Sequence, residues 1–110
     1  MAETDLYLNR RRMAAAAWAT VPLERFDLSY WKCGSKACAL GWLAEKEIDG
    51  WSWSIHCGHA TPMGPDGRTG FRGAAGYFGI TPQAAYDTFA PDGSERTPSS
   101  VGDTLLALPI

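Results

Sequence analysis

The second half of the chain carries paired signals that end one helix and begin the next, and these constrain the fold more than any other feature. Gly79 follows an apolar segment at a position suited to the left-handed cap that ends many helices. Thr81-Pro82 and Thr97-Pro98 each combine a capping hydroxyl with a proline at the first helical position. We therefore predict a helical hairpin, 71–78 followed by 82–89, and a last helix from Pro98. The inward positions would be Ala74, Ala75, Phe78, Ala84, Ala85, Phe89, Val101, Leu105 and Leu108.

The first half predicts two further helices. An alanine-rich stretch favours a helix from Thr4 to Thr20, which Pro22 would terminate. Ser35 is a suitable N-cap for a second helix over 36–48, with Asp49-Gly50 as its end. The predicted inward positions are Leu6, Met13, Ala17 and Val21 in the first helix, and Leu23, Phe26, Leu28 and Trp31 in the segment between the two helices.

One segment has the clear pattern of a strand. From Trp51 to Ile55 apolar and small polar residues alternate, which is the period of a strand with one buried face. The stretch from Gly58 to Gly70 is rich in glycine and proline and predicts a long loop. A chain of 110 residues has the length of one domain, 1–110. The predicted fold class is mainly α (α+β), with one or two short strands and a helical hairpin in the C-terminal half.

Charge and composition narrow the function classes. Ten basic and twelve acidic side chains give a net charge of −2, which disfavours a general nucleic-acid partner. The basic run Arg10 to Arg12 is expected on the solvated face of the first helix. No apolar run approaches the roughly 18 residues that span a membrane, and no secretory pattern is present. Three cysteines, an odd number, fit a reducing compartment, so a cytoplasmic protein without a membrane partner is expected.

All three cysteines and both histidines lie within 27 residues, which raises the possibility of a zinc site. The set would be Cys33, Cys38, Cys57 and His59, with His56 as an alternative ligand. Against it, the two cysteines at 33 and 38 are more widely spaced than in most zinc knuckles. The competing interpretation makes Cys38 a small buried apolar residue and the histidines surface groups. It favours a protein with neither metal nor cofactor.

The same residues suggest a nucleophile. A cysteine in the first turn of a helix meets the positive end of the helix dipole, which favours the thiolate. Cys38 would then be the nucleophile, and His56 or His59 the base. The small or apolar neighbours of Cys38 (Ala37, Ala39 and Leu40) instead favour burial. An enzyme of this kind, a cysteine-dependent hydrolase or transferase, is therefore the alternative to a binding protein.

A second alternative is a helix-turn-helix regulator that binds DNA. Residues Ala75 to Phe89 have its spacing of a small residue, a glycine in the turn and apolar anchors in the next helix. Only Gln83, Tyr86 and Thr88 could contact bases, and Asp87 would repel phosphate. Any tight helical hairpin gives the same spacing.

The remaining candidate is a protein-binding surface. Aromatic residues cluster between Tyr30 and Trp53. Two or three of them are expected to fill the core, and a surplus one exposed at the surface would be an anchor for a partner. A mobile loop flanked by aromatic side chains suits partner contact. The predicted contact residues are Trp51, Trp53, His59, Met63, Asp66 and Arg68.

The segment FDLSYWKCGSKACALGWLA, from Phe26 to Ala44, resembles a motif of small uncharacterised proteins associated with phages and prophages. They share Phe-Asp-[Met/Leu]-Ser-x-Trp, then Cys-Gly-[Thr/Ser]-x-x-Cys-x-x-Gly, and a later Ala-Ala-x-x-Phe-Gly-[Ile/Leu]-[Thr/Ser] hairpin, here from Ala74. The stretch from His56 to His59 falls outside the shared pattern. The resemblance supplies no enzymatic activity that could be carried over to this chain. It implies a phage accessory protein that binds a host or phage protein complex and inhibits a host defence component, in the manner of anti-CRISPR inhibitors.

Overall fold

Five α-helices and four short strands make up the part of the chain that the structure describes. The structure is a computed structural model, and it describes residues 2–27, 32–33, 36–56, 58–90 and 97–109. The α-helices are α1 (Ala2–Trp18), α2 (Ala39–Glu45), α3 (Gly70–Phe78), α4 (Pro82–Phe89) and α5 (Pro98–Ala107). The strands are β1 (Lys32–Cys33), β2 (Lys36–Ala37), β3 (Ser52–His56) and β4 (His59–Met63), and short 3-10 helices cover η1 (Leu23–Arg25) and η2 (Ile48–Gly50). The predicted fold class, mainly α with short strands, is confirmed.

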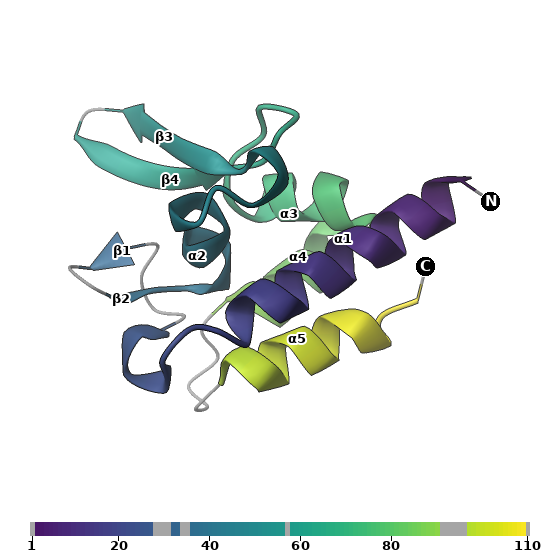
Figure 1. Cartoon of the computed structure of the whole chain (residues 1–110). Helices are drawn as coiled ribbons and strands as arrows, with labels where there is room; N and C mark the ends of the chain where they lie inside the picture. Colours follow the sequence, from purple (N-terminus) through teal and green to yellow (C-terminus); the bar gives the residue numbers. More distant parts are fainter. Residues whose placement is uncertain (1, 28–31, 34–35, 57, 91–96, 110) are drawn as a thin grey trace.

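The helices gather on one side and the hairpin of β3 and β4 projects from the other. α1 and α5 lie side by side and run in opposite directions, so the described ends of the chain are on the same side of the molecule (Figure 1). α3 and α4 form a hairpin that packs against the same group. α2 lies between the helices and the sheet of β3 and β4, and it contacts both strands. The strands pair as two separate antiparallel sheets, β1–β2 and β3–β4.

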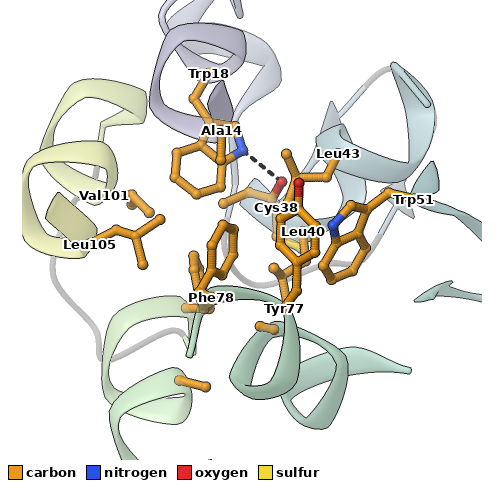
Figure 2. Close-up of a cluster of buried hydrophobic side chains, with 14 of the residues drawn as sticks. Ala14, Trp18, Cys38, Leu40, Leu43, Trp51, Tyr77, Phe78, Val101 and Leu105 are labelled. Atoms are coloured by element: carbon orange, nitrogen blue, oxygen red, sulfur yellow. Dashed lines mark hydrogen bonds between the residues drawn. The ribbon is translucent and has the colours of Figure 1, made fainter. Parts of the chain in front are cut away.

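Aromatic side chains from several helices meet in the core (Figure 2). The ring of Trp18 packs edge-on against Phe89, with 5.8 Å between centroids, and lies 6.4 Å from Phe78. Its indole Nε1 donates to the carbonyl of Ala39 at 2.8 Å, which satisfies the one polar atom of a fully buried side chain. This bond connects α1 to the first residue of α2.

The predicted capping residues mark the end of α3 and the beginnings of α4 and α5 in the structure. Gly79 ends α3 with a left-handed backbone, φ 68°. The hydroxyl of Thr81 accepts from the N–H of Ala84, and Thr97 forms a reciprocal capping box with Ser100. Pro82 and Pro98 occupy the first helical positions. All the predicted inward residues of these helices are buried except Ala84 and Leu108, which are half-buried.

The buried face of α1 differs from the predicted one. Leu6 and Met13 are 46% and 44% exposed, whereas Arg11, Ala14 and Trp18 are fully buried. The row 11, 14, 18 follows the helical period and continues to buried Val21, which was predicted correctly. The basic run is therefore not simply a solvated face, because its middle residue lies in the interior. Outside the helix, Leu23 is exposed and Phe26 is buried, while Leu28 and Trp31 lie outside the described residues.

The second helix is shorter than predicted. Lys36 and Ala37 pair with β1 as strand β2, and α2 begins only at Ala39. Its N-cap is Cys38, not Ser35, which lies outside the described residues. The helix ends at Glu45, and Asp49 in η2 has a left-handed backbone with φ 45°.

Part of the predicted loop 58–70 is a β-strand. Residues His59–Met63 form β4, which pairs with β3 from Ser52↔Met63 to His56↔His59. Pro62 lies within β4 and is buried. A two-stranded sheet tolerates this proline because a residue at an edge can direct its nitrogen away from the ladder. The remaining loop, 64–69, is held by the N–H of Gly64 donating to the carbonyl of Arg68 at 2.8 Å.

Candidate functional site

The residues proposed for zinc do not come together in the described structure. His56 and His59 face each other at the end of the β3–β4 hairpin, and both are exposed. Cys38 is buried in the core. Cys57 and the side chain of Cys33 lie outside what the structure describes. Among the described residues, no three histidine, cysteine or acidic side chains lie close enough to hold a metal ion.

The environment of Cys38 opposes a nucleophilic role. The side chain is 2% exposed, and its Sγ accepts a hydrogen bond from the N–H of Gly41 at 3.3 Å. Burial raises the pKa of the Cys38 thiol from 9.0 to about 11, because the thiolate would lose its hydration. The residue is therefore a neutral thiol at neutral pH. Its hydrogen bond caps the N-terminus of α2. The histidines proposed as its base are exposed on the hairpin, whereas Cys38 lies in the core.

The helical hairpin of α3 and α4 also offers little for reading DNA. Thr88, a predicted base contact, is only 1% exposed. The amide of Gln83 donates to the carboxylate of Asp87 at 2.9 Å, so these two exposed polar groups of α4 are engaged with each other. Tyr86 is exposed and packs edge-on against Phe71. The buried threonine and the acidic residue leave this helix without a basic reading surface.

The β3–β4 hairpin carries an apolar face that its neighbours cover only in part. Residues opposite one another in an antiparallel pair lie on the same face, which groups Trp53, Pro62, Ile55 and Ala60. At the base of the hairpin this face meets α2, where the indole of Trp53 donates to the Glu45 carboxylate at 3.0 Å. Exposure then increases along the strand, and Ile55 is 67% exposed. This is the largest exposed fraction of any large apolar side chain in the described residues.

The predicted contact residues divide into three groups. Trp51 is a core residue, 1% exposed and packed edge-on against Tyr77 at 5.4 Å, so it cannot be a surface anchor. Trp53 and Met63 are half-buried on the hairpin. His59, Asp66 and Arg68 are exposed as predicted. The strand pattern predicted Ile55 on a buried face, and this was wrong, because the side chain is 67% exposed.

A small cavity of about 220 Å³ lies between α1, α3 and the loop 64–69. It is lined by Arg10, Pro65, Asp66, Gly76 and Tyr77. The guanidinium of Arg10 lies 4.6 Å from the centre of the Tyr77 ring and donates to that residue's carbonyl. The Tyr77 hydroxyl donates to the Asp49 carboxylate at 2.9 Å. Burial and this bond raise the pKa of Tyr77, so the hydroxyl stays protonated and the network is a structural tie.

No protein-family model matches this chain, and neither a curated protein nor a solved structure is significantly similar to it. The helices in the described part of the chain are too short or too polar to cross a membrane.

Proposed function

We propose that this chain is a non-enzymatic protein that binds a partner protein through the β3–β4 hairpin. The observation that carries the proposal is the 67% exposure of Ile55 on the apolar face of the hairpin. Exposed branched apolar side chains stabilise a complex when a partner removes them from water. Half-buried Trp53 lies two residues away on the same face and adds the aromatic area that anchors protein interfaces.

The hairpin is well placed for such contact. It projects from the group of helices, so that a partner can approach its free end without meeting the helices (Figure 1). Its base is fixed by the packing of β3 and β4 against α2. A surface held rigidly at its base loses little conformational freedom on binding, which favours affinity.

The partner class follows from the resemblance to small phage-associated proteins. We infer a cytoplasmic protein or protein complex of a bacterial host, with a component of host defence as the target to be inhibited. The buried, protonated Cys38 supports binding rather than cysteine-dependent catalysis as the working activity.

The test compares two exposed apolar residues in affinity capture from a bacterial lysate. Ile55→Glu places a charge on the proposed contact surface, and Leu23→Glu is the matched control, since Leu23 is 61% exposed on η1. We expect a host protein that is retained by the parent chain and by Leu23→Glu but lost with Ile55→Glu. The purified pair should then show at least a tenfold weaker Kd for Ile55→Glu, equivalent to about 1.4 kcal/mol.

Circular dichroism must show that both variants fold like the parent chain. Equal retention of the partner by Ile55→Glu and the parent would rule out the hairpin as the contact surface.

A further inference from the structure

We propose that a second cavity, between α3, α4 and the loop 64–69, binds a phosphate monoester. The cavity has a volume of about 400 Å³ and is lined by Arg68, Arg72, Ala75 and Pro82. Two of its four lining residues are arginines and none is acidic. On a chain with a net charge of −2, this is a local concentration of positive charge. The cavity is separate from the apolar face of the hairpin, so the inference does not depend on the proposed function.

The two guanidinium groups remain available to a ligand. Within the described structure, Arg72 is exposed and makes no ion pair or hydrogen bond through its side chain. Arg68 pairs with Asp66, but the contact is between Nε and the carboxylate at 3.7 Å, which is longer than a hydrogen bond. Its terminal amino groups are therefore free to bind a second acceptor.

The loop holds Arg68 beside the cavity before any ligand arrives. The N–H of Arg68 donates to the Asp66 carboxylate at 3.1 Å, and its carbonyl accepts from Gly64 at 2.8 Å. A Cβ at Gly73 would collide with that same carbonyl, so the loop backbone lies directly against α3. Fixing the backbone in advance reduces the entropy that binding must overcome.

The donors that line the cavity favour a phosphate monoester over a diester or a carboxylate. A phosphate monoester carries between one and two negative charges at neutral pH and offers three acceptor oxygens, and arginine binds such oxygens in pairs. Asp66 already offsets part of the charge of Arg68, so the match to a monoester rests on the number of acceptor oxygens that Arg68 and Arg72 can share. A phosphodiester or a single carboxylate carries only one charge and offers only two free acceptor oxygens, so it forms fewer hydrogen bonds to the two guanidinium groups. The volume also leaves room for part of the group that bears the phosphate.

The test is a titration with inorganic phosphate at constant ionic strength, monitored by NMR of the arginine Nε–H groups. We expect saturable shifts of Arg68 and Arg72 with a millimolar Kd. Arg72→Gln should weaken binding by about tenfold, the effect of losing one charge-assisted hydrogen bond. Arg12→Gln is the matched control, since Arg12 is an exposed arginine of α1, and it should bind like the parent chain. Shifts that do not saturate, or a Kd that is unchanged in Arg72→Gln, would overturn the proposal.

Two further ligands test two separate questions. A phosphopeptide tests which kind of molecule supplies the phosphate, and a phosphodiester tests the preference for a monoester. A phosphoserine peptide that binds more tightly than inorganic phosphate, while its unphosphorylated form does not bind, identifies a modified protein as the source. Equal affinity for both phosphates identifies a small metabolite. Dimethyl phosphate should bind at least tenfold more weakly than inorganic phosphate, because it carries a single charge. Equal or tighter binding of this diester would contradict the monoester assignment.

Discussion

Arg11 places a positive charge in the interior of the protein. Its side chain is fully buried, and its guanidinium donates to the carbonyls of Phe78, Leu108 and Pro109 at 3.1, 2.7 and 3.2 Å. These carbonyls lie at or just beyond the C-terminal ends of α3 and α5, where the helix dipole is negative. Burial lowers the pKa of Arg11, but a guanidinium remains charged at any pH that a folded protein survives.

We predict that Arg11→Lys lowers the free energy of unfolding by about 2–4 kcal/mol, although it keeps the charge. An ammonium lacks the planar fork that reaches three separate carbonyls, so buried acceptors would lose their donors. Arg12→Lys, one residue along on the exposed face, should change stability by less than about 0.5 kcal/mol. Urea denaturation of both variants measures the difference. Similar stabilities for the two would show that the hydrogen bonds of Arg11 do not hold the helices together.

Cys38 should make stability depend on pH in the alkaline range. Its folded pKa is about 11, against an ordinary value of 9.0, so the unfolded chain loses this proton first as pH rises. The unfolded state then binds fewer protons, and stability falls between these two values. Cys38→Ser removes the titration and retains an acceptor for the N–H of Gly41. We expect the free energy of unfolding to fall more steeply from pH 9 to 11 in the parent chain than in this variant; equal slopes would contradict the buried thiol.

At the scale of elements, sequence prediction succeeded where a boundary is set by neighbouring residues. Gly79, Thr81 and Thr97 act through hydrogen bonds or backbone angles within a few residues. α3 and α4 have the predicted bounds to within one residue, and α5 begins at Pro98 as predicted. β4 was missed because Pro62 disfavours a strand unless the position is at an edge, which depends on the whole sheet. α2 begins late because Lys36 and Ala37 pair with β1 instead of extending the helix.

The close contact between α3 and the loop 64–69 can be tested by comparing two glycines of the same helix. A Cβ at Gly73 would overlap the backbone carbonyl of Arg68, whereas one at Gly76 would lie 3.1 Å from the Asp66 carboxylate, a side chain that can move. Both Gly→Ala changes gain the same helix propensity, about 1 kcal/mol. We predict that Gly73→Ala nevertheless destabilises by about 1–3 kcal/mol through overpacking, while Gly76→Ala is neutral or stabilising. Thermal unfolding of the two variants measures this; equal Tm values would place the loop further from the helix.

At the scale of the whole molecule, the core and the surface sites differ in how far the sequence anticipates them. The spacing of apolar residues and the capping residues together predicted most of the buried positions of α3, α4 and α5. They could not predict that Arg11 is buried, because its acceptors lie 67 to 98 residues away along the chain. The two-arginine cavity likewise depends on how the loop 64–69 meets α3 and α4. The alternating pattern of the predicted strand included Ile55. Only the structure shows that Ile55 lies beyond the part of the hairpin that α2 covers, which leaves its side chain exposed.

Arg11 connects the N-terminal helix α1 to the last described residues of the chain. This predicts that the two ends of the molecule are coupled in stability. Ending the chain at Ala107, with the terminus amidated so that no new carboxylate can pair with Arg11, removes the carbonyls of Leu108 and Pro109 and leaves part of the Arg11 guanidinium without acceptors. We expect the truncated chain to be less stable by about 2–4 kcal/mol, since an uncompensated buried donor on a charged group is costly.

A double-mutant cycle with Arg11→Met separates this effect from the loss of Leu108 as a packing residue. In the Arg11→Met background no charge is left unsatisfied, so the same truncation should cost about 1–2 kcal/mol less than it does in the parent chain. Urea denaturation of the four proteins gives the coupling energy. Additive costs would mean that the C-terminal segment stabilises the fold through apolar packing alone, and that the hydrogen bonds between Arg11 and the end of the chain contribute nothing to holding α1 against α5.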